Sequence, residues 1–166
     1  MRVINKHLLI FISFLVSFGN FIFGYSLVSI SMMEDPIARE NSLNGPERDY
    51  QLSIITTLLP LGAFLATFLT NHFTNFLGER KTMIYLDVFA FAVITYQAHH
   101  ISVTSLYMTR FLLGAYLGVS SSILPVYLVS ISPPELSGLI GSFQQLLLTI
   151  GISVAYRLGY VGFNSA

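Results

Sequence analysis

The sequence predicts an all-α protein, a polytopic bundle of helices that cross a lipid bilayer. Hydrophobic residues make up 54% of the 166 residues and charged residues only 10%, whereas about 25% of an ordinary soluble domain is charged. The charges are also clustered, because none lies between Lys6 and Glu34 or between Asp49 and Glu79. A spanning helix needs about 20 apolar residues. These stretches have helical length, not the shorter length of barrel strands.

The remaining charges leave room for five spans in a single domain, residues 1–166. Between Lys81 and Arg157 the only charged residues are Asp87, Arg110 and Glu135. Two adjacent prolines precede Glu135 and are expected to break the helix there. The expected spans are residues 8–31, 50–76, 82–98, 107–131 and 136–156.

The connections between the spans predict the orientation of the chain. Residues 32–49 hold seven charges and are expected to form a water-facing loop, and residues 78–81 are expected to form a tight polar turn. The turn makes the second and third spans antiparallel neighbours. One side of the membrane then receives four basic residues and the other side three, which favours a cytoplasmic N-terminus. The first set is Arg2, Lys6, Arg80 and Lys81, and the second is Arg39, Arg48 and Arg157.

Composition excludes several classes of protein. Eight basic residues balance eight acidic ones, so a basic nucleic-acid-binding domain is not expected. The absence of cysteine removes disulfides, thiolate metal sites and cysteine nucleophiles. His99 and His100 are adjacent and have no nearby carboxylate in the sequence, so we predict no metal site. No phosphate-binding loop or catalytic triad order occurs. We therefore expect no enzyme activity and no cofactor, with the lipid bilayer as the first partner.

A few polar residues inside the expected spans are candidates for function. Arg110 lies about three residues inside the fourth span, where a cation either extends to the interface or faces a polar interior as a gate. Asp87 is either an interfacial carboxylate or a titrating acid. Gln144 and Gln145 lie near the middle of the fifth span. An amide at that depth must find a partner, either another helix or a sugar hydroxyl group.

Glycines are spaced for close helix packing in the fourth span. Gly114 and Gly118 form a small-x-x-x-small pattern, which is typical of helices whose backbones approach closely. Gly138 and Gly141 extend the set of small residues into the fifth span. Close packing is the interpretation we favour, and a substrate cavity beside the glycines is the alternative.

These motifs together resemble the sugar porters of the major facilitator superfamily, over about residues 18 to 156. Those proteins share R-x-x-x-G-x-x-x-G, P-x-Y-x-x-E-x-x-P and R-G patterns, a glutamine in span five, and a D-x-x-G-R-R turn. The matching segments here are Gly24-Tyr25, Gly62, Asn75-x-x-Gly78-x-Arg80, Arg110-Phe-Leu-Leu-Gly114-Ala-Tyr-Leu-Gly118, Pro125-Val-Tyr127, Ser132-Pro133, Gly138, Gln144-Gln145 and Gly151.

The resemblance implies part of the N-terminal half of a major facilitator fold, with a cytoplasmic N-terminus. It implies that Gln145 contacts sugar, and Gln144 and Arg110 are the other two candidates for substrate binding. It also implies that Arg110 matches the arginine that pairs with a span-one acid in proton-coupled members. Ser26 stands where those members have that acid, and serine cannot titrate.

Further departures fall on the charged residues that the family uses as an inner gate. Glu79 stands in place of the first arginine of the turn, next to the retained Arg80. Ser130 and Ser137 stand where the family has an acid and an arginine. Loss of partners on both sides leaves no stranded charge but removes the switch. These five positions, Ser26 included, are expected to form a degenerate gate.

Two functions of different class follow. The first is a degenerate, truncated sugar-transporter-like protein that is an accessory subunit of a larger membrane complex and does not transport by itself, with other integral membrane subunits as partners. An organellar inner membrane such as the mitochondrial one would suit that function. The alternative is a hexose transporter or half-transporter that works by facilitated diffusion, with a sugar ligand and a plasma-membrane location.

Overall fold

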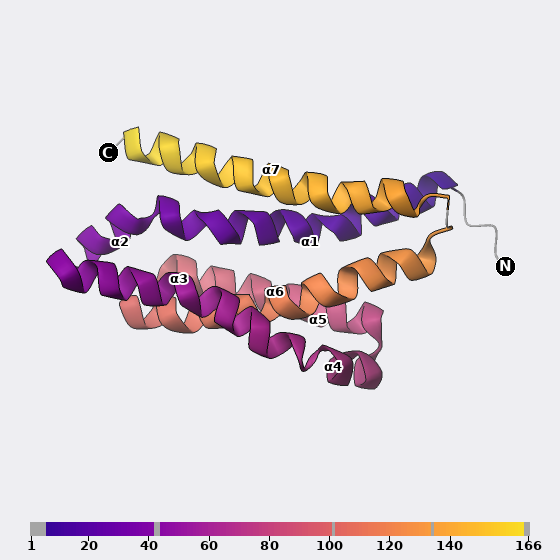
Figure 1. Cartoon of the computed structure of the whole chain (residues 1–166), viewed down its shortest axis with the longest axis horizontal. Coiled ribbons are helices and arrows are strands. Elements are labelled where there is room, and N and C mark those ends of the chain that lie inside the picture. Colours follow the sequence, from indigo (N-terminus) through magenta and orange to yellow (C-terminus); the bar gives the residue numbers. More distant parts are fainter. Residues whose placement is uncertain (1–5, 42–43, 101, 134, 165–166) are drawn as a thin grey trace. The chain divides into compact units, whose positions relative to one another are not determined.

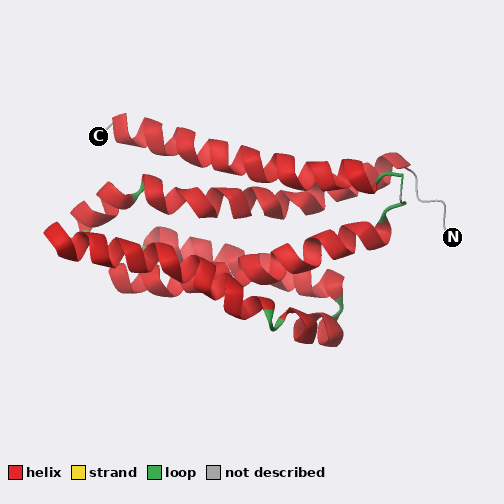
Figure 2. Ribbon diagram, viewed as in Figure 1, coloured by secondary structure: helices red, strands yellow, loops and turns green. Residues whose placement is uncertain are grey.

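The computed structural model describes residues 6–41, 44–100, 102–133 and 135–164, and within these ranges the chain is helical with no strand. The prediction of an all-α protein is confirmed (Figures 1 and 2). The described residues form the helices α1 (Lys6–Met32), α2 (Glu34–Glu40), α3 (Gly45–Thr67), α4 (Thr70–Leu77), α5 (Glu79–His99), α6 (Val103–Ile131) and α7 (Ser137–Asn164).

The chain divides into two compact units. The central unit runs from Ile30 to Ile123, and the terminal unit contains the residues up to Ser29 together with those from Leu124 onward. The terminal unit therefore holds most of α1, the last turns of α6 and all of α7. The central unit holds α2 to α5 and the larger part of α6.

In the terminal unit α1 and α7 lie side by side (Figure 1). A Cβ atom added at Gly24 would lie 2.1 Å from the carbonyl oxygen of Leu148, and one added at Gly151 would lie 2.2 Å from the carbonyl oxygen of Phe21. Both distances are far shorter than a van der Waals contact, so each glycine is needed where the other helix crosses. The two backbones touch because neither helix has a side chain at this point.

In the central unit, glycines likewise allow the backbones of α3 and α6 to approach closely. A Cβ atom at Gly114 would lie 2.1 Å from the carbonyl oxygen of Leu59, and one at Gly118 would lie 2.2 Å from that of Ala63. Gly62 on α3 is blocked in the same way by the backbone of α6. The structure therefore has the close helix packing that we favoured for the Gly114–Gly118 pattern. Gly138 and Gly141 do not extend it, because a Cβ atom added at either glycine would have no heavy atom within 4 Å.

The stretch predicted as one span over residues 50–76 is divided in the structure. Helix α3 ends at Thr67, and α4 begins at Thr70. The Leu69 N–H bonds to the carbonyl oxygen of Ala66, three residues back, at 3.0 Å. The Thr67 hydroxyl donates to the Ala63 carbonyl oxygen at 2.8 Å. Such local bonds compete with the regular i to i−4 ladder and allow the chain to turn.

The segment 32–49, expected to be a water-facing loop, contains the helix α2. Its apolar face is buried, since Ile37 and Ala38 are 2% and 5% exposed. Ile37 joins Leu52 and Ile55 of α3 in one apolar cluster. The charged residues of the segment concealed this pattern, because only two adjacent residues of α2 carry the packing.

Four helices among the described residues are long and apolar enough to cross a membrane. They are the segments Leu9–Met32, Gly45–Thr67, Val103–Ile131 and Ser137–Tyr160. Helix α5, which contains the expected span 82–98, does not belong to this set, and it is also the helix that carries Asp87. The presence of five spans therefore stays a prediction. Gly78, with φ 79° and ψ 152°, forms the predicted turn before α5, and Glu79, Arg80 and Lys81 lie in the helix's first turn.

Candidate functional site

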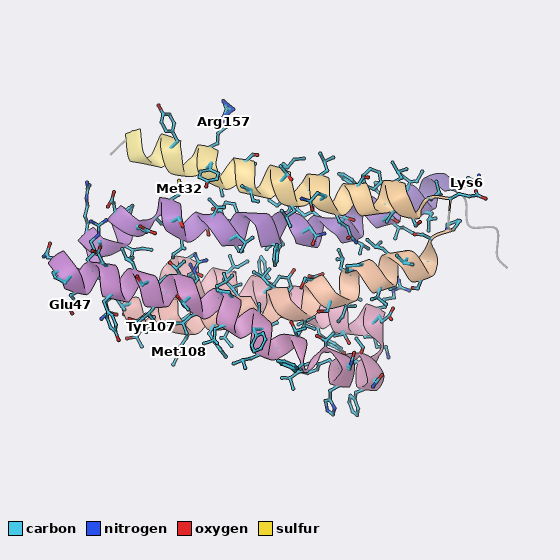
Figure 3. All side chains as sticks on the ribbon, viewed as in Figure 1. Lys6, Met32, Glu47, Tyr107, Met108 and Arg157 are labelled. Atoms are coloured by element: carbon cyan, nitrogen blue, oxygen red, sulfur yellow. The ribbon has the colours of Figure 1, made fainter. Side chains whose placement is uncertain are left out.

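A line of polar side chains follows one exposed face of α7. Its members are spaced three or four residues apart, which places them on the same face of a helix. Figure 3 shows the end of this line, where Arg157 projects from α7 on the side away from α1. We call this face the α7 polar stripe, and it consists of Ser142, Gln145, Thr149, Ser153 and Arg157, all exposed.

The hydroxyl groups of the stripe donate to their own helix. The Ser142 hydroxyl donates to the Gly138 carbonyl oxygen at 3.0 Å. The Thr149 hydroxyl donates to the Gln145 carbonyl oxygen and the Ser153 hydroxyl to that of Thr149, both at 2.9 Å. Each hydroxyl oxygen therefore presents only acceptor lone pairs outward.

Gln145 is the exception in the stripe, because its side chain brings both a donor and an acceptor. Its amide makes no hydrogen bond to another residue that the structure describes. Gln144 is half-buried and lies about 100° further around the helix. The two predicted sugar contacts thus differ in position, and only Gln145 lies on the polar stripe.

Sequence reasoning missed the rest of this stripe. Ser142, Thr149 and Ser153 were not selected from the sequence, because a single serine or threonine in an apolar span gives no sign of a functional site. Their spacing around Gln145 is the signal that would have found them. The stripe is exposed in a helix that is apolar enough to cross a membrane, and a polar face at that depth needs a protein partner or water.

Arg110, the predicted cation of the fourth span, is buried. Arg110 is 2% exposed, and it lies on the part of α6 that belongs to the central unit. Of the two interpretations, an interfacial side chain reaching to water and a cation facing the protein interior, the burial agrees with the second. A buried guanidinium requires hydrogen-bonding or ionic partners inside the protein.

Asp87 of α5 accepts a hydrogen bond from the hydroxyl of Tyr116 on α6, with an oxygen–oxygen distance of 3.1 Å. Tyr116 itself is 1% exposed. This contact joins neighbouring helices of the central unit. It gives Asp87 a structural role, as an acceptor for a buried phenol, beside the two roles considered from the sequence.

The expected gate positions divide between the two units. Glu79 and Arg80 begin α5 in the central unit. The three serines belong to the terminal unit, where Ser26 is buried, Ser137 begins α7, and the exposed Ser130 donates to the Tyr127 carbonyl oxygen at 2.8 Å. Within each unit they are separate features of the helices, so their joint role stays a prediction.

The long apolar helices define an integral membrane protein, and comparison with known proteins gives the family. Residues 12–165 match the family model described as "Sugar (and other) transporter". The chain belongs to the sugar transporter family. The predicted membership of the sugar porters, and with it the partial major facilitator helix bundle, is confirmed.

Several curated proteins are similar to the chain. Facilitated glucose transporter member 4 of solute carrier family 2 is 31% identical in the human protein and 30% in the mouse protein, over 85% of this chain and 31% of theirs. Sugar transport protein 6 of Arabidopsis thaliana is 29% identical over 86% of this chain and 31% of its own length. The chain thus spans about a third of the length of these relatives.

The names of the relatives bear on the two functional hypotheses. All are named as sugar or glucose transporters, which favours the transporter alternative over the accessory-subunit hypothesis. Nothing in the comparisons supports an accessory subunit. The names also fit the expectation of a protein that is not an enzyme. The membrane that holds the chain, and any further subunits, stay predictions.

Proposed function

We propose that this chain is part of a hexose transporter that works by facilitated diffusion, and that Gln145 contacts the sugar. The observation that carries the proposal is the exposed amide of Gln145 in the α7 polar stripe. A sugar hydroxyl group both donates and accepts hydrogen bonds, and an amide can satisfy both functions at once. The names of the similar proteins support the same class of substrate.

The stripe also suits a moving substrate. The acceptor oxygens of Thr149 and Ser153 follow Gln145 at successive turns of α7, at a rise of about 6 Å per step. A sugar hydroxyl that leaves the amide therefore meets another acceptor one turn away. Weak, repeated contacts favour passage, because a single tight site would hold the substrate.

Coupling to protons is not part of the proposal. Ser26, at the position where the resemblance implies the acid of proton-coupled members, is a buried serine of α1. Since serine does not titrate in the physiological range, this position cannot bind and release a proton as the sugar moves. We therefore propose passive movement of the sugar down its gradient.

The test is sugar binding and flux by the chain in lipid. The chain is reconstituted in nanodiscs and in vesicles, and binding and entry of labelled glucose are measured. Gln145→Ala is expected to weaken glucose binding about two- to tenfold, the range for one neutral hydrogen bond. Gln97→Ala is the matched control, since it removes an amide from α5 and is expected to bind glucose as the wild type does.

Two results would overturn the proposal. One is the absence of saturable hexose binding by the wild-type chain, which would remove the sugar from the function. The other is equal binding by Gln145→Ala and the wild type, which would remove Gln145 from the site while leaving the substrate class in place.

A further inference from the structure

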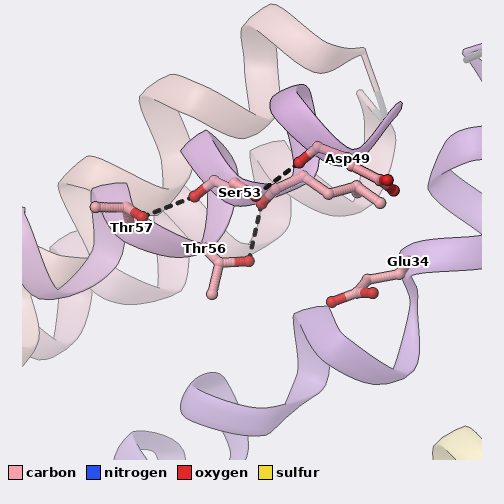
Figure 4. Close-up of a pocket in the computed structure, with 6 residues that line it drawn as sticks. Glu34, Asp49, Ser53, Thr56 and Thr57 are labelled. Atoms are coloured by element: carbon pink, nitrogen blue, oxygen red, sulfur yellow. Dashed lines mark hydrogen bonds between the residues drawn. The ribbon is translucent and has the colours of Figure 1, made fainter. Parts of the chain in front are cut away.

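A second polar site lies in the central unit, on α2 and the beginning of α3. An open pocket of about 480 Å³ is lined by one residue of α2 and one face of α3. Figure 4 shows the side chain of Glu34 across the pocket from the polar side chains of α3. The lining residues are Glu34, Asp49, Leu52, Ser53, Thr56 and Thr57.

The spacing of the residues explains why these side chains meet. The five lining residues of α3 recur every three or four positions, so they share one helix face. Glu34 precedes the buried Ile37 by one turn of α2, which directs it toward the same neighbour as Ile37. Ile37 packs in one cluster with Leu52 of α3. The carboxylate of Glu34, on the same face of α2 as Ile37, therefore also faces α3.

Contacts to α3 and α6 hold α2 in position beside the pocket. Arg48 of α3 forms an ion pair with Asp35 of α2. The Asn41 side chain after α2 donates to the Ile37 carbonyl oxygen at 3.0 Å and accepts from the Val103 N–H of α6 at 3.2 Å. A preformed site binds with a smaller loss of conformational entropy than one that must be ordered.

The polar groups of the pocket are all acceptors. The Ser53 hydroxyl donates to the Asp49 carbonyl oxygen at 2.6 Å, and the Thr57 hydroxyl to that of Ser53 at 2.7 Å. The Thr56 hydroxyl donates to the Leu52 carbonyl oxygen at 2.9 Å. Their protons are therefore engaged with the helix, and their oxygens turn only lone pairs to the pocket. Ionised carboxylates likewise only accept.

The charge around the pocket is negative. Five acidic and two basic residues lie between positions 34 and 49. One of the basic residues, Arg48, is paired with Asp35, so its charge does not compensate the carboxylates of Glu34 and Asp49. A pocket that offers acceptors and negative charge excludes anions and favours a ligand that carries donors and positive charge.

We propose that this pocket binds a small protonated amine that also carries hydroxyl groups, such as an amino alcohol or an amino sugar. The ammonium group donates to Glu34 and Asp49, and the ligand's hydroxyl groups donate to the oxygens of Ser53, Thr56 and Thr57. Leu52, which is buried, provides the apolar floor for the carbon skeleton. The site is built from residues other than those of the α7 polar stripe, and it goes beyond sugar transport because it selects for charge.

The experiment compares amines with their neutral counterparts. Binding of glucosamine, N-acetylglucosamine and ethanolamine is measured at pH 7 by calorimetry, with the chain in nanodiscs of uncharged phosphatidylcholine. Glucosamine is expected to bind more tightly than N-acetylglucosamine, which has the same ring without the charge. Ethanolamine distinguishes the two kinds of ligand. It is expected to bind if an amino alcohol is sufficient, and not to bind if the sugar ring is required. Added salt is expected to weaken the binding of amines.

Matched variants locate the site. Glu34→Gln and Asp49→Asn are each expected to weaken glucosamine binding roughly fivefold, the upper range for one exposed charge pair, and to leave glucose binding unchanged. Glu47→Gln removes a charge from the same segment but not from the pocket, and it is expected to have little effect. Gln145→Ala is expected to spare ethanolamine binding.

The outcomes decide the proposal directly. Equal affinity for glucosamine and N-acetylglucosamine would overturn it, because charge would then play no part. Equal weakening by Glu47→Gln and Glu34→Gln would also overturn it, since the amine would then respond to the general charge of the segment. If Glu34→Gln loosens α2, seen as faster hydrogen exchange there, Asp49→Asn still tests the site from α3.

Discussion

The hydroxyl of Tyr116 on α6 donates a hydrogen bond to a carboxylate oxygen of Asp87 on α5, at 3.1 Å. The phenol is almost completely buried, and a buried hydroxyl group needs a hydrogen-bond partner, which Asp87 provides from the neighbouring helix. The pair therefore connects α5, which is not among the four candidate membrane spans, to α6, the most buried of those four.

Removing the phenol hydroxyl should loosen this connection. Tyr116→Phe is expected to lower the free energy of unfolding by about 1–2 kcal/mol, because a hydrogen bond to a charged group is lost. Asp87→Asn keeps an acceptor oxygen and should cost less. Unfolding in mixed micelles, followed by circular dichroism, measures both. Tyr85→Phe is the control, since Tyr85 of α5 is 61% exposed. A Tyr116→Phe protein as stable as this control would contradict the prediction.

Side chains at the crossing of α1 and α7 should not be tolerated. Gly24→Ala places a Cβ atom 2.1 Å from the Leu148 carbonyl oxygen, and relief of that overlap requires a shift of backbone. We expect a loss of about 1–3 kcal/mol in unfolding free energy, the usual cost of overpacking. Gly141→Ala, with open space at the new atom, should be neutral or stabilising by up to about 1 kcal/mol. Equal effects of the two changes would show that the helices do not touch at Gly24.

The turn before α5 should require glycine. Gly78 has φ 79° and ψ 152°, a combination that only glycine adopts without strain. Gly78→Ala is expected to cost about 1–3 kcal/mol. Gly78→Asn should not rescue stability, because asparagine tolerates the left-handed helical region, which lies at a much smaller ψ. Gly138→Ala serves as the comparison, and thermal unfolding of all three variants measures the difference. A stable Gly78→Asn protein would argue against this turn geometry.

The α7 polar stripe should contribute to sugar affinity beyond Gln145. Thr149→Val keeps the shape of the side chain and removes the acceptor oxygen, and Ser153→Ala does the same for the next turn. Each is expected to weaken glucose binding about twofold to tenfold, as for one neutral hydrogen bond. Thr95→Val on α5 is the control, since the Thr95 hydroxyl makes the same bond to its own helix, with the Phe91 carbonyl oxygen at 2.8 Å. If all three variants bind glucose alike, the stripe does not contact the sugar.

Much of the architecture was predictable from the sequence. The charge-free stretches predicted long helices, and the Gly114–Gly118 spacing predicted close packing, because both features depend on local composition and on helix periodicity. Helix α2 was missed, since two buried residues among many charges give no periodic signal. The division between α3 and α4 was missed because local hydrogen bonds, and no proline or glycine, turn the chain there.

The candidate sites show the same contrast. Gln145 and Arg110 could be selected from the sequence because a polar or charged residue in an apolar span is costly and therefore conspicuous. The pocket beside Glu34 could not, since Glu34 and Asp49 belong to an apparently water-facing segment and become neighbours of one pocket only when α2 packs on α3.

The sequence by itself determined that the chain is helical, that it belongs in a membrane and that it resembles sugar porters, because hydropathy, charge and short motifs are properties of consecutive residues. The tertiary structure decided which glycine meets which carbonyl group, which hydroxyl protons are already used, and which carboxylates share a cavity. Those facts depend on contacts between residues far apart in the chain, and no local pattern specifies them.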